Sequence, residues 1–318
     1  MPELAFLTYC SRSGSTKLAT MIDTSGADII VVPEFRSSML AFRFGADHRL
    51  SHQELAKLTR SDAQLRTSLR LEEPAIDRVI AASVAAPPSS YVRNVVHEYL
   101  AGDQAKVVLV KSGQMIHHAK SAIDQDASIR CIFLVRDPRA VVRSLLTTKI
   151  PGHPLGATFG LGSPFYSARL WRERLRGYVT ASTAHPTQVR LVRYEALDEP
   201  STVDDVLQFL GVDGTERVDR RTGFNVADNE AAIHQRVDRP FDPLVNEQWR
   251  VELAPRTVRW IESMLFHEMR ALDYPSTGDV PGIARRIEVG LMATLYRPRE
   301  LADRLIRQAL LRLAPERF

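Results

Sequence analysis

Residues 4–18 read LAFLTYCSRSGSTKL, an apolar run that breaks into small hydroxyl residues around Gly14 and then resumes as a helical pattern. A strand that turns into a helix through such a loop aims backbone N–H groups and the helix N-terminus at one point, which attracts an anion. Arg12 adds a planar charge that can bind two phosphate oxygens at once. The stretch therefore predicts a phosphate-binding loop. The residues assigned to it are Arg12, Ser13, Gly14, Ser15 and Thr16.

The spacing of this loop differs from that of loops that bind nucleoside triphosphates. Those loops need a glycine, four further residues, and then Gly-Lys-Ser or Gly-Lys-Thr. Five positions before Gly14 stands Tyr9 instead of a glycine, and Ser15 follows Gly14 where a lysine is required. The spacing disfavours an ATP-dependent kinase. A serine-rich helix start with an exposed arginine remains the alternative without a binding role.

A second strand-to-helix transition lies in residues 130–146. Residues 131–135 are apolar and predict a buried strand, and Pro138 suits the first turn of a helix, where its missing N–H is not needed. Arg136 stands at the carboxyl end of this strand, and Ser144 lies eight residues further, about two helical turns along. Both transitions place polar residues at the carboxyl ends of strands, where ligands bind in open α/β sheets.

Together these segments resemble the sulfotransferases that use 3′-phosphoadenosine 5′-phosphosulfate (PAPS). The resemblance rests on Ser-Arg-Ser-Gly-Ser-Thr in residues 11–16 and on Leu-Val-Arg-Asp-Pro-Arg-Ala-Val-Val-Arg-Ser in residues 134–144. It implies that the first loop binds the 5′-phosphosulfate and that Arg136 and Ser144 bind the 3′-phosphate. A strand-Tyr-Glu block at Tyr194 is also similar to the family and implies that this ring lies near the adenine. The likeness covers about residues 4–275.

The same resemblance suggests which residues carry the chemistry. Sulfuryl transfer requires stabilisation of charge on the departing phosphate and removal of a proton from the acceptor. Arg12 suits the first task, and Lys111 occupies the place of a family lysine that approaches the sulfuryl group. The histidine base of the small-molecule branch is missing, because residues 111–113 read Lys-Ser-Gly.

By the same resemblance, Glu34 occupies the place where other branches of the family, including those similar to tyrosylprotein and bacterial sulfotransferases, carry a glutamate. We therefore expect Glu34 to be the general base, with Arg36 holding either this carboxylate or the acceptor. The alternative is a structural glutamate that caps the helix after Pro33, since acidic residues favour the first turn of a helix. Lys17 stands where the family has an apolar or aromatic residue, and its side chain either reaches solvent or adds charge near the phosphosulfate.

The pattern along the chain predicts an α/β fold, with a P-loop-type parallel sheet flanked by helices. Helical periodicity predicts a helical insertion over about 38–101. Residues 149–165 hold four glycines and three prolines and are expected to form a flexible flap, with Phe159 and Phe165 as acceptor contacts. The sulfotransferase-like domain is expected to span 1–275, followed by a basic amphipathic helical tail, 276–318. The expected strands are 4–9, 28–32, 106–110, 130–135 and 188–193.

The tail raises a separate question. Residues 283–318 contain eight arginines and four acidic residues, and their apolar residues recur at helical spacing. Such helices either touch an anionic membrane or a lipid-bearing acceptor, or pack on the domain or on a dimer partner.

Composition fits an enzyme of this kind. The 318 residues carry a formal net charge of +4, and no apolar run is long enough to span a membrane or to act as a signal peptide. The two cysteines, Cys10 and Cys131, are expected to be free buried thiols, which fits a cytoplasmic protein. We expect no metal, no nucleic-acid partner, and a small-molecule, carbohydrate or lipid acceptor. The rival functions are a P-loop kinase and a catalytically silent protein that binds PAPS or its product PAP.

Overall fold

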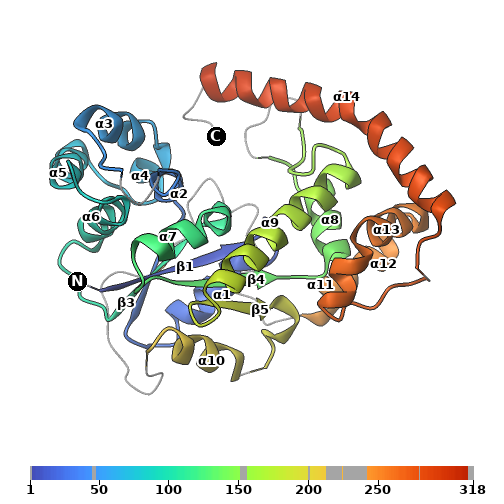
Figure 1. The fold of residues 1–318 in the computed structure, drawn as a ribbon, viewed down its shortest axis with the longest axis horizontal. Helices are drawn as coiled ribbons and strands as arrows, with labels where there is room; N and C mark the ends of the chain where they lie inside the picture. Colours follow the sequence, from blue (N-terminus) through green and yellow to red (C-terminus); the bar gives the residue numbers. More distant parts are fainter. Residues whose placement is uncertain are drawn as a thin grey trace. The chain divides into compact units, whose positions relative to one another are not determined.

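The computed structural model describes residues 2–44, 48–150, 156–199, 201–212, 224, 242–278 and 280–313. Among these residues, five strands form one parallel sheet in the order β2-β3-β1-β4-β5 (Figure 1). Each strand end lies within one residue of its predicted position, so the α/β fold class is confirmed. The strands are β1 (Glu3–Tyr9), β2 (Ile29–Val32), β3 (Val107–Lys111), β4 (Arg130–Val135) and β5 (Val189–Arg193).

The helices divide between two compact units of the chain. The first unit comprises Met1–Tyr9, Gly14–Val135 and Arg176–Arg239, and the second comprises Cys10–Ser13, Arg136–Leu175 and Pro240–Phe318. The helices are α1 (Ser15–Asp23), α2 (Arg36–Ala41), α3 (His52–Arg60), α4 (Ala63–Thr67), α5 (Glu73–Ser83), α6 (Pro88–Leu100), η1 (Gly113–His117), α7 (Ala119–Gln125), α8 (Pro138–Thr147), α9 (Pro164–Ala184), η2 (Tyr194–Ala196), α10 (Ser201–Phe209), α11 (Pro243–Glu247), α12 (Trp249–Glu252), α13 (Pro255–Ala271) and α14 (Ile283–Leu313).

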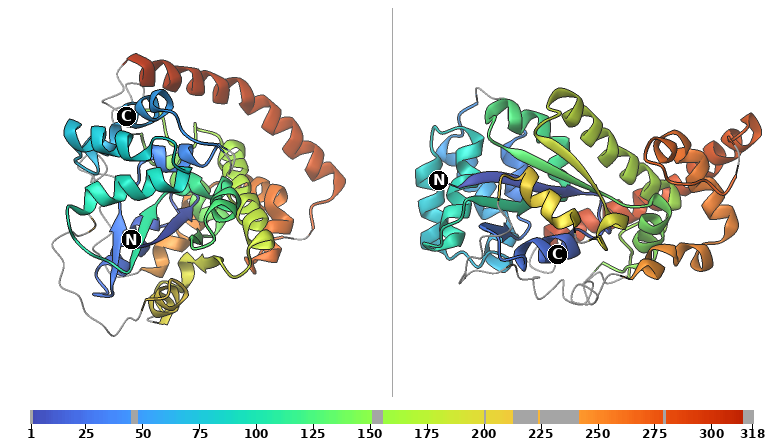
Figure 2. Two further views of the ribbon diagram at one scale, coloured as in Figure 1. Left: turned by 60° about the vertical axis from the view of Figure 1, so that its left-hand side comes forward. Right: turned by 90° about the horizontal axis from the view of Figure 1, so that it is seen from below.

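The sheet forms the centre of the first unit. All four residues of β2 and all five of β3 are buried, as expected for parallel strands covered on both faces. Helix α7 and the end of α9 cover one face, and α1 covers the other (Figure 2). On the α9 side, the rings of Phe133 and Tyr178 stack with centroids 5.3 Å apart. This packing fixes the carboxyl ends of the strands, from which the candidate site is built.

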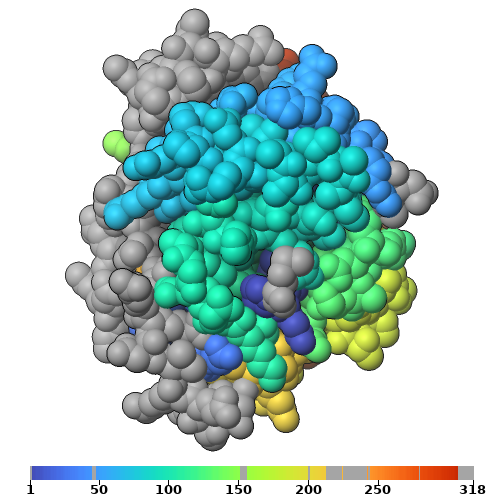
Figure 3. Space-filling model, turned by 90° about the vertical axis from the view of Figure 1, so that its left-hand side faces the viewer, coloured from blue at the N-terminus to red at the C-terminus, as the bar shows by residue number. Residues whose placement is uncertain are grey.

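The segment between β2 and β3 is helical, with α2 to α6 following one another from residue 36 to residue 100. Residues of this insertion, coloured blue to cyan, cover much of the face shown in Figure 3. The buried Asp62 anchors the start of α2, because its Oδ2 accepts hydrogen bonds from the N–H and the hydroxyl of Ser37, both at 2.6 Å. These hydrogen bonds fix the start of α2, which begins two residues after Glu34.

The second unit is organised around a buried ion network. Arg139 is only 1% exposed and pairs with Asp137 and Glu262, each at 2.7 Å, while its guanidinium lies 4.0 Å from the centre of the Trp249 ring. Asp137 also caps α8 by accepting a hydrogen bond from the Arg139 N–H at 2.8 Å. Two residues of the Arg-Asp-Pro-Arg motif therefore have a structural role, which leaves Arg136 as its candidate binding residue.

The predicted tail folds as one long helix, α14, within the described residues. No described helix is long and apolar enough to cross a membrane. In the predicted flap, residues 151–155 lie outside the described part. The flanking residues Lys149 and Thr158 form an antiparallel bridge, with the Ile150 N–H donating to the Ala157 carbonyl at 2.8 Å.

Candidate functional site

The loop after β1 is shaped by two residues with left-handed backbones. Arg12 has φ +72° and Gly14 has φ +88°, and Gly14 is the N-cap of α1 without any side-chain capping bond. A Cβ on Gly14 would lie 2.3 Å from Cδ2 and Cε2 of Tyr194. Only glycine leaves room for this aromatic ring. The structure therefore brings Tyr194, predicted from the resemblance, directly against the loop.

Two hydroxyl groups of the loop are buried without a partner. Ser13 is fully buried and Thr16 is 3% exposed, and neither Ser13 Oγ nor Thr16 Oγ1 has a hydrogen-bond partner among the described residues. Buried polar groups are nearly always hydrogen-bonded, so these two hydroxyls are available to a bound ligand. Ser15 begins α1, whose first N–H groups also lack intrahelical partners. Phosphate oxygens fit this donor set, since every group in it can donate a hydrogen bond.

The second unit gathers Arg12, Arg136 and Ser144. Arg12 Nε donates to Ser144 Oγ at 3.1 Å, and Arg136 Nη1 donates to the Arg12 carbonyl at 3.4 Å. Arg136 is further fixed by Asn246, whose Oδ1 accepts from Nε at 2.8 Å. The two predicted 3′-phosphate residues are thus joined through Arg12. Two guanidinium groups and one hydroxyl form a donor set suited to an anion.

Arg174, on α9, is a buried cation that the sequence patterns did not single out. It is 7% exposed, and its Nε and Nη1 have no hydrogen-bond partner among the described residues. Burial raises the pKa of the neighbouring Cys10 thiol to about 12, and the positive charge of Arg174 opposes this rise. Helix α9 contains four arginines, and spacing alone does not reveal which of them points inward.

Glu34 lies between β2 and α2 and is held by two hydrogen bonds. The Tyr9 hydroxyl donates to Oε2 at 2.7 Å, and the Gly113 N–H donates to Oε1 at 3.3 Å. The N-cap of α2 is Phe35, whose side chain makes no capping bond, and the first-turn N–H of Ser37 donates to Asp62 instead of Glu34. The alternative that Glu34 caps the helix is therefore wrong.

The sequence patterns do not single out Tyr9 or Gly113, although both donate hydrogen bonds to the predicted base, Glu34. A Cβ on Gly113 would come within 2.9 Å of Cε2 of Tyr9, so glycine at this position makes room for the ring. Lys111, at the end of β3, is 6% exposed, and its Nζ lies 5.7 Å from the centre of the same ring. Tyr9 thus joins Glu34 and Lys111 at the carboxyl ends of three neighbouring strands.

The predicted acceptor contacts are placed differently. Arg36 is exposed at the start of α2 and makes no described ion pair with Glu34, which is held by Tyr9 and Gly113 instead. Phe165 is fully buried, with its ring 5.2 Å from the rings of Trp260 and Tyr296. The ring therefore packs in the interior of the second unit, and its role as an acceptor contact stays a prediction.

Phe159 and Lys17 are partly buried, so both side chains reach the surface. The Phe159 N–H donates to the Thr148 carbonyl at 3.1 Å, which ties the end of the predicted flap to the end of α8. Phe159 therefore stays among the candidate acceptor contacts.

The thiols are structural groups. Cys10 and Cys131 are both free and buried, as predicted. In the part of the chain that the structure describes, no three His, Cys, Asp or Glu side chains are placed to hold a metal ion.

A sequence model described as the sulfotransferase family matches residues 5–216. The fold is similar to that of a sulfotransferase domain from the curacin biosynthetic pathway, with 17% identity, a TM-score of 0.55, and coverage of 88% of this chain and 99% of that domain. The sulfotransferase STF9 from Mycobacterium avium matches with 13% identity, a TM-score of 0.46, and coverage of 87% of this chain and 79% of that one. A sulfotransferase from Alicyclobacillus acidocaldarius matches with 14% identity, a TM-score of 0.41, and coverage of 86% and 99%. No curated protein matches the sequence.

Proposed function

The chain belongs to the sulfotransferase family, and from this premise we propose that it transfers a sulfuryl group from PAPS to a hydroxyl or amine of an acceptor. The observation that carries the choice of donor is the pair of buried, unpartnered hydroxyls of Ser13 and Thr16 in the loop before α1. Phosphate oxygens of the donor would satisfy both groups. The kinase alternative loses its support, because the family is one of sulfotransferases and the loop lacks the Gly-Lys pair.

The donor supplies an already activated sulfuryl group, so the protein has to bind it, orient it and stabilise the charge that develops on the phosphate. Arg12 and the backbone N–H groups of the loop suit the last task, since preorganised donors at a helix N-terminus stabilise negative charge. Arg136 and Ser144 would bind the 3′-phosphate, and Tyr194 would lie beside the adenine. The full proposed donor set is Arg12, Ser13, Gly14, Ser15, Thr16, Arg136, Ser144 and Tyr194.

Glu34 is the proposed general base that takes the proton of the acceptor. Its carboxylate is oriented by the Tyr9 hydroxyl and the Gly113 N–H, so the base does not have to be positioned during the reaction. Lys111, which lies against the same tyrosine ring, is proposed to support the sulfuryl group as it is transferred. Arg36, Phe159 and Phe165 remain proposed contacts for a small-molecule, carbohydrate or lipid acceptor.

The test is transfer of radiolabelled sulfate from PAPS to fractionated cell extract, followed by identification of the labelled molecule. Replacing Glu34 with glutamine should lower turnover about 100- to 10,000-fold, the usual contribution of a general base. Adenosine 3′,5′-bisphosphate should bind this variant as it binds the wild type.

Glu72→Gln is the matched control, because Glu72 is an exposed glutamate of the same unit that makes no capping bond. It should retain wild-type turnover. Full turnover by the Glu34→Gln variant would overturn the assignment of the base, and binding of the donor without transfer to any acceptor would favour the silent alternative.

A further inference from the structure

The outer side of α14 carries a continuous apolar stripe. Its large apolar side chains are between 56% and 79% exposed. The first four are spaced four residues apart, and the last two follow the first two by 18 residues, which is about five helical turns, so all six lie along one side. The stripe extends about 33 Å at 1.5 Å per residue. Its members are Ile283, Ile287, Leu291, Leu295, Leu301 and Leu305.

A row of positive charge borders this stripe. Arg286, Arg297 and Arg304 are exposed and are separated by 11 and 7 residues, which places them along one edge of the helix. None of the three pairs with a carboxylate among the described residues. The guanidinium carbon of Arg304 lies 5.0 Å from the centre of the Tyr166 ring, and this arginine is still exposed.

Two of the three carboxylates in α14 are engaged within the same unit, and the third, Asp303, is partly buried. Glu288 accepts hydrogen bonds from Arg256 and from the Trp260 indole, both at 3.1 Å. Glu300 is buried and pairs with Arg169 and with the hydroxyl of Ser163. The helix therefore presents basic groups at its apolar edge, while these two acidic groups are neutralised by its own unit.

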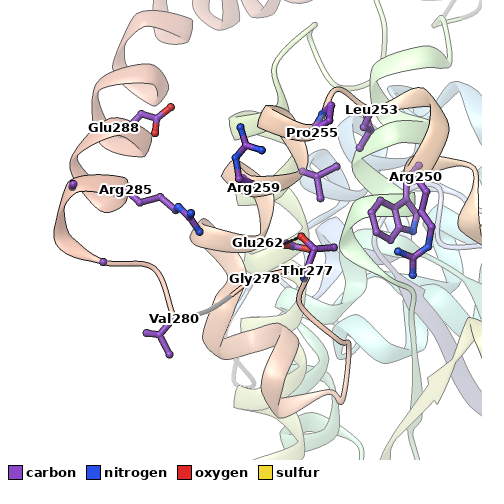
Figure 4. A pocket seen from close by; sticks show the side chains of 14 residues that line it. Arg250, Leu253, Pro255, Arg259, Glu262, Thr277, Gly278, Val280, Arg285 and Glu288 are labelled. Atoms are coloured by element: carbon purple, nitrogen blue, oxygen red, sulfur yellow. Dashed lines mark hydrogen bonds between the residues drawn. The ribbon is translucent and has the colours of Figure 1, made fainter.

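The opposite side of α14 is already occupied. The Tyr296 ring packs against Phe165 with centroids 5.2 Å apart. Near its start, α14 lines an open cavity of about 830 Å³ together with α12, α13 and the segment that precedes α14, and Arg285 points from α14 into it (Figure 4). Among the described side chains of α14, the apolar stripe and its basic border stay exposed and can meet a partner.

From this arrangement we propose that α14 binds the surface of an anionic lipid bilayer. The apolar stripe would lie at the boundary between headgroups and acyl chains, parallel to the membrane, and the three bordering arginines would contact lipid phosphates. An amphipathic helix with arginines beside an apolar face binds anionic membranes in this manner. The proposal is independent of the sulfuryl donor and of the assigned base.

Charge and shape favour a bilayer over other partners. A second copy of α14 would bring the same arginine row against its counterpart, and like charges repel. A protein groove that surrounds a helix contacts several faces of it, whereas α14 has one exposed face. A flat, anionic, partly apolar surface matches both the charge and the single accessible side.

The test is co-sedimentation of the full chain with vesicles of phosphatidylcholine alone and with vesicles of equal parts phosphatidylcholine and phosphatidylglycerol. The protein should pellet with the anionic vesicles, should stay in solution with the neutral ones, and should be released by high salt. Replacing Arg286, Arg297 and Arg304 together with glutamine should weaken partitioning about 100-fold or more, since each arginine near the surface contributes to binding.

A second variant separates the apolar contribution from folding. Leu291→Asp with Leu295→Asp should abolish pelleting without changing the urea midpoint, because both side chains are exposed. Val251→Asp, at an exposed valine on α12 of the same unit, should pellet as the wild type does. Wild-type protein that stays in solution with anionic vesicles, or a Leu291→Asp/Leu295→Asp variant that pellets normally, would overturn the proposal. So would a wild-type dimer in analytical ultracentrifugation that this double variant turns into a monomer.

Discussion

Replacing Gly14 with alanine places a methyl group where the loop after β1 has no room. The added Cβ meets Cδ2 and Cε2 of Tyr194 at 2.3 Å, and the backbone stands at φ +88°. The left-handed conformation costs a non-glycine residue about 1–2 kcal/mol. The methyl group also lowers the conformational entropy of the unfolded chain, which offsets about 0.4–1 kcal/mol of this destabilisation. Displacing a packed ring adds about 1–3 kcal/mol.

The chain offers a matched control in Gly102. Its φ is +99°, and a Cβ there would meet nothing within 4 Å. Gly102→Ala therefore carries the same backbone cost without the clash. The difference in unfolding free energy between Gly14→Ala and Gly102→Ala isolates the contact with Tyr194, and we expect it to be about 1–3 kcal/mol.

Urea unfolding followed by far-UV circular dichroism measures both variants. The additional variant Gly14→Ala/Tyr194→Ala should recover most of the difference, because it removes the ring that the methyl group displaces. Equal destabilisation by Gly14→Ala and Gly102→Ala would refute the inference that Tyr194 packs on Gly14.

Three further variants test other parts of the structure. Tyr9→Phe removes the hydroxyl that orients Glu34. In steady-state kinetics, kcat should fall about 10- to 100-fold while the KM for the donor is unchanged, and an unaltered kcat would contradict this. Arg139→Met leaves the buried carboxylates of Asp137 and Glu262 without their cation. The free energy of unfolding measured by urea titration should fall by about 3–5 kcal/mol, and a loss below about 1 kcal/mol would contradict this. Burial raises the pKa of the Cys131 thiol from 9.0 to about 12, so the unfolded chain releases this proton first and stability falls as pH rises through that window. Cys131→Ala should reduce that fall by up to about 1.4 kcal/mol per pH unit, and an unchanged slope in pH-dependent unfolding would contradict the assignment.

The sheet was predictable because parallel strands buried on both faces leave a local signature. Apolar runs such as residues 131–135 are expected to be buried, and several of them are bounded by charged residues, so the strand ends could be predicted to within one residue. The loop around Gly14 was predictable for a related reason, since the chemistry of an anion-binding turn is confined to a few consecutive residues.

Contacts between distant residues had no such signature. Asn246 holds Arg136 from 110 positions away, and nothing in the neighbouring sequence shows that this amide is buried. Phe165 was assigned to a flexible flap from the glycines and prolines around it, but Trp260 and Tyr296 bury its ring. Composition describes the backbone of a segment and leaves open which of its side chains tertiary packing draws inward.

Tyr9 shows an intermediate case. It ends the first strand, at the position where a loop that binds nucleoside triphosphates would need glycine. Its role emerges once Glu34 and Gly113, from two other loops, are placed beside it. The identity of the base was open to sequence reasoning, whereas the groups that orient it were not.

Isothermal titration calorimetry with adenosine 3′,5′-bisphosphate and with adenosine 5′-monophosphate tests the central claim most directly. Two charge-assisted hydrogen bonds to the 3′-phosphate contribute about 1.5–3 kcal/mol each, so the bisphosphate should bind at least about 100-fold more tightly. Ser144→Ala should reduce that preference. Equal affinity for the two nucleotides in folded wild-type protein would contradict the assignment of Arg136 and Ser144, and with it the proposed donor.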